Sequence, residues 1–466
     1  MNHGPLGELA AVDYPVHFHR ETMPAWLVAV LTALGRRAPD LRRPFTWLDL
    51  GCGAGLGALV GAATHPLGRF VGVDADPRAI ERAQAVASAA GLDNVRFECL
   101  DFDTLAARTD APLGPCDFIV SHGVYSWVAP DRRRAMRRIV EHSLVPGGVA
   151  CLGYMSQPGG ASFAAARRLM TLAGEGSPVA RVPAGLALLQ ALADGGAGYF
   201  TEHPTALREL QRLHAEDARQ LAHEFLGSHW HALHVADVMA DFAAAGCEWA
   251  GSATPLENID AVSLPAASQP LLAKLQREGA DAALLETARD LARNQTLRRD
   301  LFLRAHREGN LLGDDRHRAA LLAQRVCLTP QAPVAPSPQG ELRLDTRIGP
   351  VTLPMALVAP LLAALHDGVA SYADIARAPA FAAQPGVLSV LLQTLAWAGW
   401  LQFVRPDWPA SGSAIEMRRA AALEEALARE PGLAGRWRVA PAIGSALPDA
   451  PAASGPRLAA LGCRVR

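Results

Sequence analysis

The segment from Asp49 to Gly55 (Asp-Leu-Gly-Cys-Gly-Ala-Gly) has the composition of a loop that binds a ligand through its backbone. Gly51, Gly53 and Gly55 have no β-carbon, so the chain can approach a ligand closely there, with Cys52 between the first two. A dinucleotide-binding loop reads GxGxxG and binds a pyrophosphate, but its third glycine is not in place here. An acid at position 49 disfavours a phosphate and favours a ligand that carries positive charge.

Acidic side chains recur where the next two expected strands end. Asp74, followed by Ala75, comes 25 residues after Asp49, at the place where an acid accepts hydrogen bonds from both ribose hydroxyls. Asp101 is placed to accept from an adenine 6-amino group, and Phe102 to stack on the adenine ring. S-adenosylmethionine carries an ammonium and a sulfonium but no phosphate. The charges of these segments therefore predict S-adenosylmethionine as the cofactor.

The fourth expected strand ends at Ser121, His122 and Gly123, which we expect beside the reacting methyl group. Tyr125 and Trp127 follow, and their rings could hold an ammonium and its methyl groups by cation–π contacts worth roughly 0.5–2 kcal/mol. We name His122, Tyr125 and Trp127 as candidate catalytic residues. The alternatives are that His122 fixes the loop and that Trp127 packs on the helix that follows.

These segments need a framework that brings strand ends together. Short buried runs predict five strands, at 45–49, 69–74, 95–99, 117–121 and 149–154, and the intervening patterns predict helices at 58–64, 77–90 and 132–143. Strands that alternate with helices indicate an α/β fold with a parallel, doubly wound sheet. Ligands of such sheets lie outside the carboxyl ends of the strands, so the segments above can converge on one ligand.

The alternation stops near residue 160, and the chain to about residue 325 is predicted to be almost entirely helical. A Pro-rich stretch follows at 330–338, and two helices and a strand after it suggest a small winged-helix-like module. We therefore expect four parts: a cofactor-binding domain at 1–195, a helical domain at 196–329, a linker at 330–340, and a winged-helix-like domain with a polar tail at 341–466.

The stretch from Tyr14 to Tyr154 resembles the class I S-adenosylmethionine-dependent methyltransferases in the motifs quoted above. A narrower resemblance spans roughly residues 13–305 and is to bacterial methyltransferases with a methyltransferase regulatory domain, among them protein-lysine methyltransferases that act on outer-membrane proteins. The segments that carry it are Tyr14-Pro15, 122–128 (His-Gly-Val-Tyr-Ser-Trp-Val), 221–226, His229-Trp230 and 294–300.

This resemblance implies a Rossmann-like seven-stranded sheet, a helical middle domain over the site and a smaller C-terminal domain. It also implies methyl transfer to lysine side chains of a protein substrate. The residues themselves leave open a small-molecule methyltransferase with a helical lid, and a cofactor-binding regulatory protein. Tyr14, ahead of the fold, is expected either to close over the cofactor or to pack against the domain.

Composition narrows the function classes further. The formal net charge of −2 gives no sign of a nucleic-acid partner. The seven cysteines are scattered without a CxxC pair, so we expect no metal site and a reducing, cytoplasmic location. An apolar run long enough to cross a bilayer is also missing, so we expect no membrane insertion. A homodimer remains open.

Overall fold

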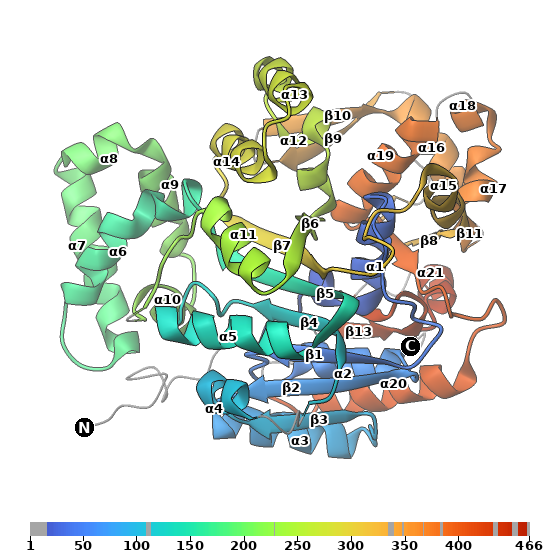
Figure 1. Cartoon of the computed structure of the whole chain (residues 1–466). Coiled ribbons are helices and arrows are strands. Elements are labelled where there is room, and N and C mark those ends of the chain that lie inside the picture. The colour runs from blue at the N-terminus through green and yellow to red at the C-terminus, as the bar shows by residue number, and fades with distance from the viewer. Residues whose placement is uncertain are drawn as a thin grey trace.

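A seven-stranded sheet forms the centre of the computed structural model (Figure 1), which describes residues 16–108, 113–227, 229–333, 340–346, 349–366, 368–382, 385–431, 437–449 and 455–463. Its strand order is β3-β2-β1-β4-β5-β7-β6, and β7 runs antiparallel to both of its neighbours. The strands are β1 (Phe45–Leu50), β2 (Gly68–Asp74), β3 (Val95–Cys99), β4 (Cys116–His122), β5 (Leu144–Met155), β6 (Cys247–Ser252) and β7 (Leu297–Arg304).

Helices cover both faces of this sheet because successive strand residues point to opposite sides. Trp47, Phe70 and Phe118 pack with α1 (Pro24–Ala33), α2 (Leu56–Thr64) and α3 (Pro77–Ala89). Leu48 and Ile119, one position further along, belong to the opposite core, which is covered by α4 (Phe102–Ala107), α5 (Pro130–Ser143) and α11 (Val235–Ala244). The α/β class and the Rossmann-like sheet are thereby confirmed.

Local sequence signals account for the helix borders next to the site. Pro77 opens α3, and the Asp76 carboxylate accepts the backbone N–H of Arg78 at 3.0 Å. Gly91 follows the helix with φ +62°, a backbone conformation that is unfavourable for residues with a β-carbon. The prediction of a helix over 77–90 is confirmed to within one residue.

Strands β6 and β7 correct the prediction for residues 160–325. The sequence predicted helix throughout, yet residues 247–252 and 297–304 complete the main sheet. The first half of β7 does not have the apolar pattern of a buried strand, because Arg298 and Asp300 are both buried and charged. The sheet therefore takes its last two strands from the expected helical domain, and the domain boundary at 195/196 stays a prediction.

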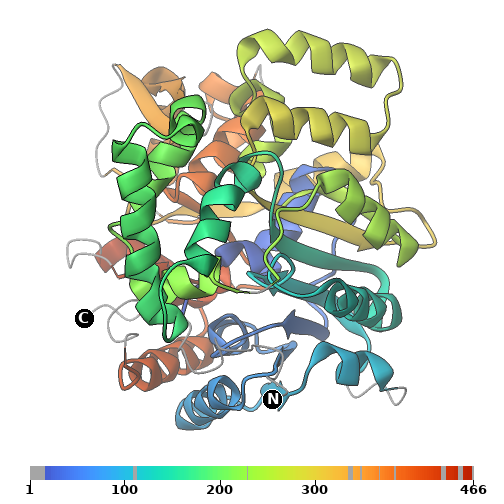
Figure 2. The same cartoon turned by 90° about the vertical axis from the view of Figure 1, so that its left-hand side faces the viewer.

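A group of short helices forms its own core beside the carboxyl edge of the sheet (Figures 1 and 2). Its elements, which we call the helical group, are η3 (Gly159–Phe163), α6 (Ala164–Leu172), α7 (Pro178–Asp194), α8 (Gly198–Glu202), α9 (Pro204–Leu213) and α10 (Ala218–Phe225). The chain then returns to the sheet through α11 and β6. Between β6 and β8 lie η4 (Pro255–Asn258), α12 (Asp260–Ser263), η5 (Ala266–Ser268), α13 (Gln269–Arg277), α14 (Ala282–Arg293), β7 and α15 (Asp314–Ala323).

The C-terminal part begins before the Pro-rich stretch rather than after it. Strand β8 (Arg325–Leu328) is the middle strand of a three-stranded sheet with β11 (Ala370–Ser371) and β12 (Leu401–Val404). This strand lies before the expected boundary at 340/341, which stays a prediction, and residues 334–339 lie outside the described part. The remaining elements are β9 (Glu341–Thr346), β10 (Gly349–Pro354), α16 (Met355–Ala364), α17 (Tyr372–Ala376), α18 (Pro379–Ala382), α19 (Pro385–Trp397), α20 (Ala414–Leu427), β13 (Trp437–Ala440), η6 (Pro441–Ile443), β14 (Ser445–Pro448) and α21 (Gly455–Ala460).

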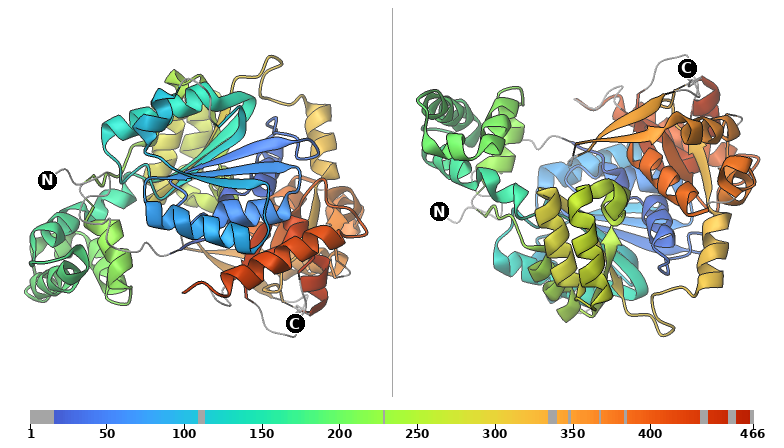
Figure 3. Two further views of the ribbon diagram at one scale, coloured as in Figure 1. Left: turned by 90° about the horizontal axis from the view of Figure 1, so that it is seen from below. Right: turned by 90° about the horizontal axis from the view of Figure 1, so that it is seen from above.

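This C-terminal part shares a hydrophobic core with the main sheet. Leu391, Leu395 and Leu423 belong to the same buried cluster as Leu27 and Leu59 of α1 and α2. Figure 3 shows α20 lying along α3, on the face of the sheet that α2 also covers. The winged-helix assignment stays a prediction. Within the described residues no helix combines the length and apolar character that a membrane span needs.

Candidate active site

The glycine loop leaves β1 and turns over the end of β2. The backbone N–H groups of Gly51 and Cys52 donate to the Val73 carbonyl at 2.8 and 3.1 Å. Gly51 and Gly55 have φ values of +84° and +71°, and a β-carbon at Gly55 would overlap with the ring of Phe97. Glycine is therefore required there by backbone conformation and by packing.

Gly53 and Cys52 of the loop differ in what they face. A β-carbon at Gly53 would meet nothing within 4 Å, so this part of the loop is free to approach a ligand. The Cys52 thiol lies against the sheet instead, since a β-carbon at Gly72 would be 2.8 Å from its Sγ. Cys52 therefore serves the site through its backbone.

Asp74 lies next to the glycine loop and fixes its backbone by accepting hydrogen bonds. Its carboxylate accepts the N–H of Gly53 at 2.8 Å and the N–H of Asp76 at 3.0 Å, across the turn that contains Ala75. Burial raises the pKa of this carboxyl above its usual value. The predicted ribose acceptor is thus held beside the one loop glycine that faces open space.

Asp49 is a half-buried acid at the end of β1 and has no cationic partner within 4 Å among the described residues. Burial, and then the negative charge of Asp74, raise its pKa to about 7. A ligand with positive charge would favour the ionised form of Asp49 and offset the cost of burying it. Together with the Gly53 surface and Asp74, this acid fits the ammonium-bearing S-adenosylmethionine.

Asp101 has a structural task in addition to the predicted contact with adenine. It caps α4 by accepting the N–H of Thr104 at 2.8 Å, and Arg132 lies 3.4 Å from the same oxygen. The capping bond lowers the pKa of Asp101. Phe102, the first residue of α4, is half-buried against the core under α5. Both residues lie at the carboxyl edge of β3, as predicted.

The residues that end β4 fix the edge of the sheet. Ser121 is 3 % exposed and donates to the Leu50 carbonyl at 2.8 Å, so it joins β4 to β1 rather than facing a ligand. Gly123 turns the chain with φ +73°. His122 accepts a hydrogen bond at Nε2 from Arg299 Nε at 3.2 Å, and its ring stacks on His19 at 3.6 Å between centroids.

These contacts make His122 a poor proton acceptor. Burial, and then the neighbouring His19 and Arg299, lower the pKa of His122 well below its usual value. The Nε2 lone pair is engaged by the guanidinium of Arg299. These contacts favour the alternative in which His122 holds its surroundings in place, and a catalytic role for His122 stays a prediction.

Tyr125 and Trp127 also have packing partners. Tyr125 is 1 % exposed in the core under α5, and its hydroxyl donates to Asp241 Oδ2 at 3.2 Å. The Trp127 indole N–H donates to the Glu224 carbonyl of α10 at 3.2 Å, which ties the loop after β4 to the helical group. Both rings thus have partners within the protein, and the expectation that they receive the acceptor stays a prediction. Tyr14 lies outside the described residues.

Three further groups lie at this edge that were not among the predicted site residues, namely His19, Glu21 and Arg299. Glu21 precedes α1 and has a side chain 17 % exposed, 3.5 Å from Arg20. Burial opposes ionisation of Glu21, but the charges of Arg299 and Arg20 outweigh it and lower its pKa. Burial, and then Arg299, lower the pKa of His19 to about 4. The adjacent Arg298 and Arg299 were the sequence signal that could have revealed Arg299, because a buried strand seldom carries two arginines.

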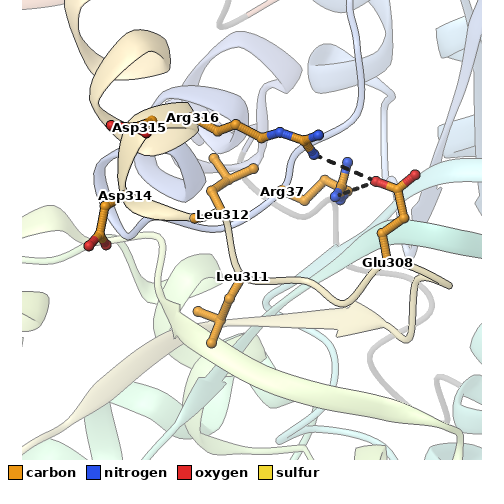
Figure 4. Close-up of a pocket in the computed structure, with 8 residues that line it drawn as sticks. Arg37, Glu308, Leu311, Leu312, Asp314, Asp315 and Arg316 are labelled. Atoms are coloured by element: carbon orange, nitrogen blue, oxygen red, sulfur yellow. Dashed lines mark hydrogen bonds and ion pairs between the residues drawn. The ribbon is translucent and has the colours of Figure 1, made fainter.

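A shallow hollow of about 420 Å³ lies elsewhere, around the loop that leads into α15 (Figure 4). Arg37 and Glu308 form an ion pair of 2.9 Å across it, and Arg316 approaches the same carboxylate to 3.8 Å. None of the predicted site residues lines it. The carboxyl edge of the main sheet therefore remains the candidate active site.

Family models of known proteins match two parts of the chain, the cofactor-binding part and the part that contains β6 and β7. A methyltransferase-domain family model matches residues 48–148, which contain the glycine loop, Asp74 and Asp101. A second model, described as a predicted methyltransferase regulatory domain, matches residues 217–304 and so includes β6 and β7. Fold and site together define a class I S-adenosylmethionine-dependent methyltransferase. The chain belongs to the family of these enzymes that carries the regulatory domain.

Solved structures and curated relatives are similar to this chain over most or part of its length. PKMT2 from Rickettsia typhi superimposes with a TM-score of 0.68 at 19% identity, covering 94% of this chain and 87% of that one, and its complex with AdoHcy gives 0.64 over 84% and 77%. An uncharacterized protein of Synechocystis is 29% identical over 80% of this chain and 71% of its own length. An uncharacterized protein of Rickettsia prowazekii is 30% identical over 46% of this chain and 86% of its own.

Proposed function

We propose that this enzyme transfers the methyl group of S-adenosylmethionine to lysine side chains of a protein substrate. The observation that carries the proposal is the extent of the likeness to PKMT2, a name in which PKMT denotes a protein-lysine methyltransferase. The likeness is not confined to the cofactor-binding sheet, since it covers 94% of the chain and thus includes the helical group and the C-terminal part. The segments quoted from the sequence support the same assignment.

The chemistry at the carboxyl edge is compatible with an amine acceptor. Bound S-adenosylmethionine supplies an electrophilic methyl group on a sulfonium. A lysine amine must first lose a proton, which costs about 4.6 kcal/mol from a pKa of 10.4 to pH 7. Desolvation and a neighbouring positive charge both lower that pKa, so the reaction needs no dedicated strong base. The engaged Nε2 of His122 supports this view.

The residues of this chain then act mainly by positioning. Asp74 and the loop at Gly53 would hold the nucleoside end of the cofactor, and Asp49 its ammonium. Trp127 fixes the loop after β4 to the helical group, which therefore borders the acceptor side. Positioning of two reactants in this way can supply several kcal/mol of the barrier. We place the enzyme in a reducing compartment, the cytoplasm, which is supported by its seven free cysteines.

Transfer of label from the cofactor tests the proposal. The full chain is incubated with a bacterial lysate and with a low concentration of S-adenosylmethionine labelled in its methyl group, and the Asp74→Ala variant serves as the control with weakened cofactor binding. Labelled protein bands that yield methyl-lysine on hydrolysis are expected with the wild type, and weaker bands with the variant. Label confined to small molecules would contradict the proposal, and so would labelled protein that yields only other methylated amino acids.

A further inference from the structure

Adjacent arginines in β7 have opposite electrostatic surroundings. Arg298 is 1 % exposed and surrounded by carboxylates, with Glu286, Asp290 and Asp300 at 2.5–2.8 Å. Arg299 points to the other face of the sheet, as the next residue of a strand must. Among the described residues it forms no ion pair within 4 Å, and the side chains to which it donates hydrogen bonds, His122 and Thr254, are uncharged.

The position of Arg299 is set by the register of the sheet. Gly153 of β5 pairs with His122 on one side and with Arg299 on the other, so the three residues form one row across the sheet. A β-carbon on Gly153 would lie 2.5 Å from the His122 ring. The glycine therefore leaves space in which the imidazole of β4 and the guanidinium of β7 meet above β5. His122 accepts the Nε–H at 3.2 Å and orients the guanidinium.

This row lies next to Asp49 on the same face. Asp49 pairs with Val120, which pairs with Cys151, and Cys151 pairs with Leu301, so the Arg299 row is two residues closer to the carboxyl edge. Two strand residues span about 7 Å, and neighbouring strands lie about 4.8 Å apart. The contact with His122 brings the charge of Arg299 back over β4, the strand next to β1. The buried Cys151 thiol experiences the charges of both Arg299 and Asp49.

Arg20 and Glu21, which lie near this row, form a pair at 3.5 Å, and the charge of Arg299 also acts on the Glu21 carboxylate. His19, which stacks on His122, is held neutral by its low pKa. Asp49 and Arg299 themselves form no ion pair within 4 Å among the described residues. Their arrangement is complementary to a group that carries an ammonium and a carboxylate on the same carbon.

We propose that Arg299 binds the carboxylate of the amino-acid end of S-adenosylmethionine, while Asp49 binds its ammonium and His122 positions the guanidinium. A charge-assisted hydrogen bond of this kind contributes roughly 1.5–3 kcal/mol, equivalent to about a 10- to 150-fold change in affinity. The proposal concerns the cofactor alone and holds whether or not the acceptor is a lysine.

Decarboxylated S-adenosylmethionine tests this assignment because it keeps the nucleoside, the sulfonium and an ammonium but lacks the carboxylate. Binding of both ligands is measured by calorimetry on the wild type, on Arg299→Met and on Arg304→Met. Arg304 lies on the same strand away from the site, where it donates to the Glu141 carbonyl, and is the matched control. The wild type and Arg304→Met should prefer the complete cofactor by about 10- to 100-fold. Arg299→Met should lose this preference and bind the decarboxylated ligand as the wild type does.

Three results would overturn the proposal. Equal weakening of both ligands by Arg299→Met would indicate a structural role for the arginine. Unchanged affinities together with a raised KM for the acceptor would assign Arg299 to the substrate. Absence of any preference in the wild type would show that no residue of the site recognises the carboxylate, and this measurement does not depend on whether a variant folds.

Discussion

The carboxylates of Asp49 and Asp74 belong to neighbouring strands, and the negative charge of Asp74 adds to burial in raising the pKa of Asp49 to about 7. Neither acid has a cationic partner within 4 Å among the described residues. An acid held near half-ionisation in this way responds strongly to a bound cation. The pair therefore links cofactor binding to pH.

Cofactor binding should release a proton from Asp49. The ammonium of the ligand favours the ionised carboxylate, so the bound enzyme has a lower Asp49 pKa than the free enzyme. Affinity should then rise about tenfold per pH unit below pH 7 and level off above it. Calorimetry at pH 7 in buffers of different ionisation enthalpy should give about half a proton released per cofactor bound. In Asp49→Asn the proton release should vanish; its persistence would assign the proton to another group.

The same pKa shift predicts how the free enzyme's stability depends on pH. A carboxyl whose pKa is higher in the folded state than in the unfolded chain stabilises the fold while it is protonated, and this contribution is lost as the pH rises through about 7. Asp49→Asn lacks the titrating group and should therefore be more stable than the wild type at pH 8, by roughly 1–3 kcal/mol. The difference should become smaller at pH 6. Denaturant unfolding without cofactor measures both values, and a difference independent of pH would contradict the expectation.

Asp74→Ala should weaken cofactor binding by roughly 1–3 kcal/mol, or about 5- to 150-fold. The variant loses the predicted ribose acceptor and also the acceptor for the Gly53 N–H. Asp76→Ala is the matched control, since it removes the cap of α3 and should cost about 1 kcal/mol of stability without the same loss of affinity. Equal effects of the two substitutions on affinity would show that Asp74 acts only by shaping the turn.

The places of Asp49, Asp74 and Asp101 in the fold could be predicted because their signals are local in the chain. Each of Asp49, Asp74 and Asp101 ends a strand or opens a helix, and parallel strands align such positions at one edge. A local pattern can predict ligand binding for a residue whose side chain is already engaged in a structural hydrogen bond. Asp101 caps α4 with the same carboxylate that was assigned to adenine.

The surroundings of the residues that follow β4 could not be predicted in the same way, because their contacts are distant in sequence. His122 meets Arg299 across 177 positions, and Tyr125 meets Asp241 across 116. The histidine and the tyrosine have residue types suited to catalysis, but their roles depend on strands that the hydropathy pattern does not reveal. Strand β7 begins with charged residues whose burial is made possible only by tertiary ion pairs.

Trp127→Phe should loosen the helical group without disturbing the cofactor site. Phenylalanine keeps an aromatic ring but cannot donate to the Glu224 carbonyl, a bond worth about 1 kcal/mol. Hydrogen exchange should become faster in α10, while cofactor affinity should change less than about twofold. Tyr199→Phe removes a hydrogen bond to Ser162 inside the helical group and controls for effects within that core. If exchange in α10 is the same in Trp127→Phe as in the wild type, the indole does not tether the two parts.

Arg298→Met should destabilise the fold far more than other arginine substitutions in β7. Arg298 compensates three carboxylates that are each at most 3 % exposed, and Tyr154 and Trp249 donate to one of them, Asp300. Removing the cation leaves buried negative charge, which costs roughly 3–5 kcal/mol. Arg304→Met, at the other end of the strand, should cost less than about 1 kcal/mol.

The pH dependence of that loss separates electrostatics from packing. Burial already raises the pKa of Asp290 to about 6 with Arg298 present. Without the guanidinium the pKa of Asp290 rises further, so its protonated form stabilises the variant as the pH falls. Denaturant unfolding should therefore show a larger gap between wild type and Arg298→Met at pH 8 than at pH 5.5. A constant gap would mean that the methionine merely packs badly and that the buried charges of β7 do not depend on Arg298.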